Sequence, residues 1–131
     1  MHGEHRRAWA AWAGIAAAVL IGSAGCASLP IAPPAQVSAG EPEFGRRALV
    51  DYGCASCHTI PGVPGADAFV GPPLNHWARR SYIAGALTND QDHLVRWIMD
   101  PQSVEPGTAM PDLGVTENDA VNISAYLLSL D

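Results

Sequence analysis

The sequence predicts an all-α domain of three to five short helices joined by long ordered loops. Apolar residues recur at helical spacing in three segments, and no segment is a convincing strand. In addition, 13 Gly and 11 Pro in 131 residues leave little room for long helices. A chain of this length forms one small domain with a modest core. We therefore expect something bound inside the domain to organise its loops.

The first predicted helix spans residues 43–52 and ends at Gly53, because one of its faces is apolar: Phe44, Ala48, Leu49 and Tyr52. Residues 59–74 contain too many prolines and glycines for a helix or a strand, so we expect them to form a loop. Residues 77–84 have room for one turn of helix. Residues 106–114 form a second long loop.

The next predicted helix spans residues 93–99, and Pro101 stops it. Residues 89–92 precede it as an N-cap region, and their acidic side chains suit the positive end of a helix. Thr116 begins the last helix, with Asp119 three residues on as an approximate capping box. Apolar residues then repeat at helical spacing: Ile123, Tyr126, Leu127 and Leu130.

The N-terminus carries the features of an export signal. Arg6 and Arg7 precede the uncharged residues 8–25, which have about the length of a signal h-region or a short membrane span. Small residues followed by Cys26 then resemble a bacterial lipobox, although Ser23 stands where an aliphatic residue is preferred. We expect lipidation at Cys26. An uncleaved anchor and an ordinary cleaved signal are the alternatives, and all three export the rest of the chain.

We divide the chain into a signal or anchor (residues 1–26), a Pro/Ala-rich tether (27–42) and a folded domain (43–131). Of the 13 acidic and 7 basic residues, 12 and 5 lie beyond residue 26, a formal charge of −7 without any lysine. Such an acidic surface argues against nucleic acid as a partner. It favours partners with a basic patch, or it simply keeps the protein soluble.

Residues 54–58 read CASCH, which places two of the three cysteines beside a histidine. A structural zinc site needs four ligands and normally a second Cys/His pair, but Cys26, His76 and His93 are not paired. A thioredoxin-like redox motif needs a βαβ setting. A disulfide within the motif would not require His58.

The C-x-x-C-H pattern is instead typical of covalent haem attachment. Two intervening residues space Cys54 and Cys57 for thioether bonds to the two vinyl groups of haem. His58, which follows directly, supplies the proximal iron ligand. Covalent haem attachment in bacteria takes place outside the cytoplasm, where the N-terminal segment sends this chain. The sequence therefore predicts one haem c.

From about residue 41 to residue 131 the sequence resembles class I, mono-haem cytochromes c. The landmarks, in order, are an aromatic-bearing first helix, CASCH, Gly71-Pro72-Pro73-Leu74, Met110-Pro111 and Ala125-Tyr126-Leu127. A more particular resemblance, to cytochrome c domains associated with haem–copper oxidases, rests on three stretches: SYIAG (81–85), LVRWI (94–98) and DPQ (100–102). The resemblance implies a class I cytochrome c fold and an electron carrier rather than an enzyme.

The second iron ligand must come from a distant loop. Met99 falls on a predicted helix, where a methionine is usually core filler. Met110 lies in a Pro/Gly-containing loop, and the family pattern places the ligand just before a proline. We expect Met110 to bind the iron, with His76, His93, Met99 or an open position as alternatives.

The same resemblance implies several supporting contacts. The carbonyl of Pro72 accepts a hydrogen bond from Nδ1 of His58. Gly45 and Tyr126 form the crossing of the first and last helices. The candidates to meet the haem propionates are Arg79, Arg80, Tyr82 and Trp97.

These observations predict a membrane-tethered, extracytoplasmic cytochrome that carries single electrons in a respiratory chain, to or within a terminal oxidase. Its partners would be membrane-bound redox complexes such as a haem–copper oxidase. His/Met ligation predicts a low-spin centre of relatively high potential. The alternatives are a peroxidase-like haem enzyme or sensor with a labile sixth ligand, and a fixed cytochrome subunit of a dehydrogenase complex.

Overall fold

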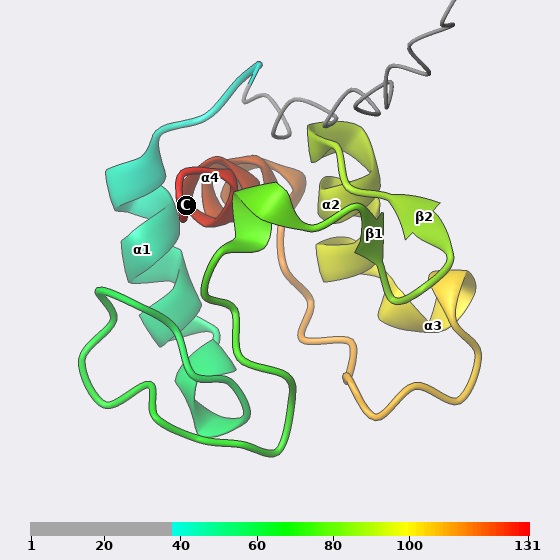
Figure 1. The fold of residues 1–131 in the computed structure, drawn as a ribbon, viewed down its shortest axis with the longest axis horizontal. Coiled ribbons are helices and arrows are strands. Elements are labelled where there is room, and N and C mark those ends of the chain that lie inside the picture. The colour runs from blue at the N-terminus through cyan, green and yellow to red at the C-terminus, as the bar shows by residue number, and fades with distance from the viewer. Residues whose placement is uncertain (1–37) are drawn as a thin grey trace, which may run out of the picture. The chain divides into compact units, whose positions relative to one another are not determined.

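The computed structural model describes residues 38–131, so the predicted signal, Cys26 and most of the tether lie outside the described residues. Figure 1 shows the helices of this part: α1 (Pro42–Asp51), α2 (Gln91–Met99), α3 (Pro101–Val104) and α4 (Glu117–Leu128). Single 3-10 turns lie at Cys54–Ser56 and Trp77–Arg79. The all-α prediction is confirmed. None of these helices has both the length and the apolar character needed to cross a bilayer.

The sequence did not indicate the small hairpin that the structure contains. Strands β1 (Tyr82–Ile83) and β2 (Leu87–Thr88) pair antiparallel. Residues 84–86 join them, and within this turn Ala84 and Gly85 have φ of 49° and 72°. Positive φ at both central residues is characteristic of tight hairpin turns. Alanine rarely adopts this conformation, which is why the turn escaped prediction.

Helices α1 and α4 cross at Gly45. A Cβ atom on Gly45 would lie 2.0 Å from the carbonyl oxygen of Asn122, so no other residue allows the two backbones to approach this closely. Asn122, rather than the expected Tyr126, is therefore what Gly45 meets. Tyr126 lies one turn further along α4, where its hydroxyl donates a 2.5 Å hydrogen bond to the carbonyl oxygen of Pro61. It fixes the loop that follows the CASCH segment.

The helix caps follow the predicted chemistry. Asp90 caps α2 by accepting the backbone N–H of His93 at 3.0 Å. In α4, the Thr116 hydroxyl accepts the N–H of Asp119 and donates to its carboxylate. Pro101 has a second role beside stopping α2, because it is the first residue of α3. Proline suits that position, where its missing N–H would have no helical partner.

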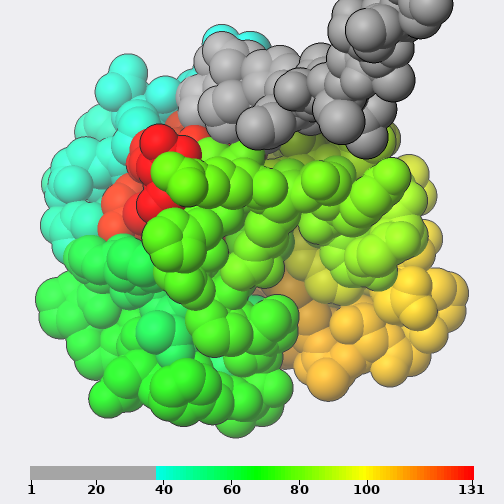
Figure 2. Space-filling view, in the orientation of Figure 1, coloured from blue at the N-terminus to red at the C-terminus, as the bar shows by residue number. Residues whose placement is uncertain are grey.

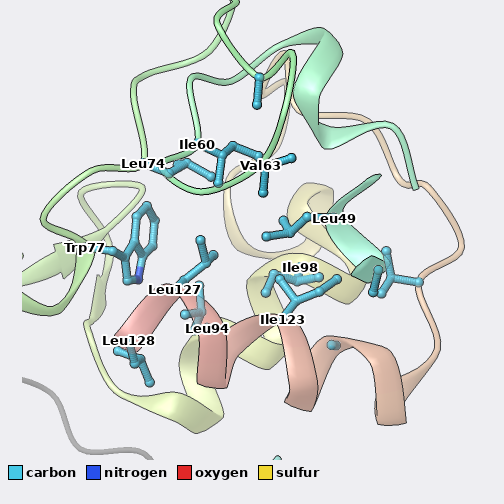
Figure 3. Packing of buried hydrophobic residues seen from close by; sticks show 14 of the residues in the cluster. Leu49, Ile60, Val63, Leu74, Trp77, Leu94, Ile98, Ile123, Leu127 and Leu128 are labelled. Atoms are coloured by element: carbon cyan, nitrogen blue, oxygen red, sulfur yellow. The ribbon is translucent and has the colours of Figure 1, made fainter. Parts of the chain in front are cut away.

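The hydrophobic core lies between α1, α2 and α4 and continues under the loop of residues 59–74. Figure 3 shows buried side chains from each of these parts pointing toward one another: Leu49, Ile60, Leu74, Trp77, Leu94, Ile98, Ile123 and Leu127. Most of them also line a cavity within the domain. The core therefore forms a wall of the cavity rather than filling the centre of the domain.

Candidate functional site

One cavity of about 360 Å³ brings nearly all the predicted site residues together. In Figure 2 the surface is hollowed between the green segments and the orange loop that follows α3. The predicted site residues that line the cavity are Cys54, Cys57, His58, Pro72, Arg80, Tyr82, Trp97 and Met110. Arg79 is the exception. It is exposed, and its Nε lies 3.3 Å from the carboxylate of Asp131.

The CASCH segment is shaped by a tight turn. Gly53 lies just after the end of α1 and has a left-handed backbone conformation, with φ of 73°. A 3-10 turn begins at the next residue, Cys54. The backbone N–H groups of Cys57 and His58 both donate to the carbonyl of Cys54, at 3.2 and 3.1 Å. This turn directs both thiols and the imidazole to one cavity. Burial raises the pKa of the Cys54 thiol.

The ring of His58 is held by the Gly71-Pro72 segment. Its Nδ1 lies 2.8 Å from the carbonyl oxygen of Pro72, so Nδ1–H donates and Nε2 keeps its lone pair for a metal. The N–H of Gly71 donates to the carbonyl of Cys57 at 2.7 Å. A Cβ atom on Gly71 would lie 2.4 Å from Cε1 of His58. The close approach of this loop to the ring therefore requires glycine.

Of the four side chains considered as the second ligand, Met110 lines the cavity, while Met99, His76 and His93 do not. Met99 packs against the hydrophobic core. His93 pairs instead with the carboxylate of Asp90, 2.7 Å from its Nδ1.

Gln102 of α3 fixes the loop that carries Met110, a role that the sequence did not reveal. Its Nε2 donates to the carbonyls of Thr108 and Met110, at 2.8 and 3.2 Å. Its Oε1 accepts the N–H of Gly107 at 3.0 Å. Three hydrogen bonds from one side chain thus hold the loop in place.

Trp77 is a second residue that the sequence analysis missed. Its indole Nε1 is buried and has no hydrogen-bond partner among the described residues, although the side chain lines the cavity. The guanidinium of Arg80 lies 4.5 Å from the centre of the indole ring, and burial lowers the pKa of Arg80. Asn89 donates to the carbonyls of both residues. A buried indole N–H close to a partly buried arginine suits a carboxylate placed in the cavity.

These residues fit a covalently attached haem. Two free thiols, an imidazole and a thioether face one largely apolar cavity, and the orphaned Trp77 N–H and Arg80 provide donors for the porphyrin carboxylates. They do not fit zinc, because residues 38–131 contain no group of three or more His, Cys, Asp or Glu side chains able to share an ion.

Comparison with known proteins agrees with this geometry. The family model described as cytochrome c matches residues 43–131, and the chain belongs to the cytochrome c family. Members of this family are electron carriers rather than enzymes, and they bind haem c covalently. The predicted resemblance, fold class and cofactor are confirmed, and the chain is an electron carrier with covalent haem c.

Two curated relatives are both named cytochrome c oxidase subunit 2. The protein of Alkalihalophilus pseudofirmus is 37% identical over 87 residues, 66% of this chain and 25% of that protein. The protein of Bacillus sp. strain PS3 is 31% identical over 87 residues, 63% of this chain and 24% of that protein. The chain thus spans about a quarter of the length of these relatives.

Among solved structures, cytochrome c2 from Rhodobacter sphaeroides matches with a TM-score of 0.50 and 26% identity, covering 70% of this chain and 97% of that one. The match extends over nearly the whole of that cytochrome. It supports the class I cytochrome c fold independently of the sequence motifs.

Proposed function

We propose that this protein is a membrane-tethered, extracytoplasmic cytochrome that passes single electrons to or within a terminal oxidase of a respiratory chain. The observation that carries the proposal is the convergence of Cys54, Cys57, His58 and Met110 on one cavity. We assign the two thiols to haem attachment, and His58 and Met110 to the two axial positions on iron.

The axial pair favours electron transfer over bond chemistry. Haem c, when bound, exchanges one electron between its ferrous and ferric states. The Met110 thioether is neutral and soft and favours the ferrous state, which raises the potential relative to two histidines. The buried wall of α2 and α4 adds to this, because low dielectric disfavours the extra charge of the ferric state. His58 and Met110 would together hold the iron, which would leave no position on it open to O₂ or peroxide.

The acceptor is proposed from the relatives. Both are named cytochrome c oxidase subunit 2, and similarity over 87 residues supports a haem–copper oxidase as the complex that receives the electrons. The acidic surface, with a formal charge of −6 for the whole chain, suits an acceptor that presents basic side chains.

We further propose that the chain before the domain attaches it to a membrane. Residues 38–41 enter the domain at the end far from the loops that carry Cys57–Gly71 and Met110 (Figure 1). Gln91 fixes this entry, since its amide bonds both Ser38 and Ala39. A tether to the membrane would raise the local concentration of the domain near membrane partners. We assign residues 1–26 to export and Cys26 to lipidation.

Spectroscopy of the purified holoprotein tests the electron-carrier assignment. We expect a sharp low-spin α band on reduction, a weak band at the red end of the ferric spectrum, and no rapid CO binding. High-spin ferric haem or rapid CO binding would support the peroxidase-like enzyme or sensor instead. Mild solubilisation of membranes then separates a free shuttle from a fixed subunit, because only the latter co-purifies with an oxidase or dehydrogenase.

A Cys26→Ala variant tests the anchor. We expect the wild-type protein to remain with the membrane fraction and the variant to lose its lipid. A variant that stays in the membrane, with a mass that differs from wild type only by the substitution, would favour the uncleaved anchor.

A further inference from the structure

The loop that carries Met110, residues 106–114, contributes little to the hydrophobic core. All of its residues are exposed or half-buried, and the nearest buried residues on either side are Pro101 and Val115. Burial therefore fixes the chain before and after the loop but not the loop itself. Met110 is only half-buried. Apart from a bond to iron, polar contacts must hold this loop against the domain.

The hydrogen bonds that leave the loop converge on one side chain. Within the described part of the chain, all of them but one end at Gln102. Its amide bonds Gly107, Thr108 and Met110. The exception is the N–H of Thr108, which donates at 3.0 Å to the carbonyl of Glu105, the residue directly before the loop. Gln102 is thus the polar link between the loop and the helical part of the domain.

Gln102 itself stands on a fixed support. The side chain of Pro101, directly before it, is fully buried. On its other side, the N–H of Ser103 donates to the carboxylate of Asp100 at 3.1 Å, and the Ser103 hydroxyl donates to the Asp100 carbonyl at 2.9 Å. These contacts hold the backbone of α3 on both sides of Gln102. Its amide therefore meets the loop from a rigid element, which favours a precise position for the loop.

We propose that Gln102 is the positioning residue that keeps Met110 at the iron, and that the loop opens as a unit when this amide is lost. This inference rests on the proposed axial role of Met110 and names the group that maintains it. An open loop would leave a position on the iron free, so Gln102 favours the electron carrier over the peroxidase-like alternative. Each hydrogen bond of an exposed amide is weak, but the three act on one short segment and are lost together.

Imidazole titration of the ferric holoprotein measures the population of the open loop. A ligand that binds only the open form has an apparent affinity proportional to that population. Gln102→Leu keeps a side chain of similar size and loses all three hydrogen bonds. We expect it to bind imidazole about tenfold more tightly than wild type. Gln102→Glu has nearly the same shape, but its carboxylate cannot donate to a carbonyl at neutral pH, so it should also bind imidazole more tightly than wild type.

Met99→Ala is the matched control, because Met99 packs against the core and does not line the cavity. It should unfold more readily than wild type and yet bind imidazole with the wild-type affinity. Amide hydrogen exchange adds a readout that does not involve the iron. The N–H of Gly107, which donates to Gln102, should exchange faster in Gln102→Leu than in wild type. The N–H of Gly71, which donates to the carbonyl of Cys57, should exchange at the wild-type rate.

The outcomes separate this inference from the proposed function. Wild-type imidazole affinity in Gln102→Leu, together with much tighter binding in Met110→Ala, would overturn the role of Gln102 and leave the proposed function intact. Equal tightening in Gln102→Leu and Met99→Ala would also overturn it, because a general loss of stability would then account for both. A wild type that binds imidazole as tightly as Met110→Ala would overturn the axial role of Met110, and this inference with it.

Discussion

The Nδ1 atom of His58 and the carbonyl oxygen of Pro72 lie 2.8 Å apart, although 14 residues separate them in the chain. The contact fixes the tautomer and the orientation of the ring, because Nδ1 must carry the proton that Pro72 accepts. Gly71 makes it feasible by approaching the ring more closely than any side chain would allow. The loop and the imidazole ring of His58 thus form one unit.

Gly71→Ala should disturb this unit. The new Cβ would lie 2.4 Å from Cε1 of His58, so the ring or the loop must move, at a cost of about 1–3 kcal/mol. We expect less holoprotein, a lower unfolding free energy and a shifted midpoint potential. Gly65→Ala is the control: nothing lies within 4 Å of its Cβ, although its φ of 74° adds backbone strain. Equal potentials in wild type and Gly71→Ala would contradict the account.

Gly45→Ala tests the helix crossing, because a tight crossing reverses the sign of the effect that this substitution normally has on stability. Alanine inside a helix normally stabilises by about 1 kcal/mol relative to glycine. Here its Cβ would meet the Asn122 carbonyl at 2.0 Å, so we expect a loss of about 1–3 kcal/mol. Urea unfolding of the holoprotein measures it. Val50→Ala, at a half-exposed site on the same helix, should change stability by less than about 0.5 kcal/mol. A stabilised Gly45→Ala protein would exclude a tight crossing there.

Met110→Ala should remove the sulfur–iron bond. We expect the weak red-end band of the ferric protein to disappear and the ferrous protein to bind CO, because an axial position is freed. Met99→Ala should keep the band and lose about 2 kcal/mol of stability, since Met99 packs against the core. If the band survived in Met110→Ala and vanished in Met99→Ala, the assignment would move to Met99.

Asp119 predicts a specific dependence of stability on pH. Hydrogen bonds from the hydroxyls of Thr116 and Tyr52, at 2.7 and 2.8 Å, lower the pKa of its carboxyl below the ordinary value of 3.8. A carboxyl group whose pKa is lowered in the folded state stabilises the fold at pH values above its ordinary pKa. This contribution is lost as the pH falls through the folded-state pKa. We expect Asp119→Asn to be less stable than wild type at neutral pH.

The difference in Tm between wild type and Asp119→Asn should shrink as the pH falls below about 4. Asp51→Asn, at an exposed site on α1, is the matched control and should track the wild type. A difference for Asp119→Asn that stays constant across this range would rule out the proposed role of its charge.

The features that could be predicted from the sequence are local ones. The CASCH turn and the caps at Asp90 and Thr116 are each specified within five residues, so their chemistry is visible in the chain alone. The axial role of Met110 was predicted from its loop setting and a resemblance, and it remains a prediction. The structure adds that Met110 lines the cavity.

What the sequence could not supply depends on distant contacts. Gly45 meets Asn122 across 77 positions of the chain, and no local pattern marks that pair. Gln102 fixes the Met110 loop through hydrogen bonds that any exposed glutamine could make. Arg79 and Arg80 are adjacent and alike in sequence, yet only Arg80 faces the cavity. Tertiary packing decides between them.

The intact mass and colour of the mature protein, produced with its haem-attachment machinery present, test the central claim most directly. The account predicts a red protein whose mass exceeds that of the mature polypeptide, with any lipid, by one haem that denaturation does not release. It also predicts that a Cys54→Ser, Cys57→Ser double variant retains no haem after denaturation. A colourless wild-type protein whose mass includes no haem would contradict the account.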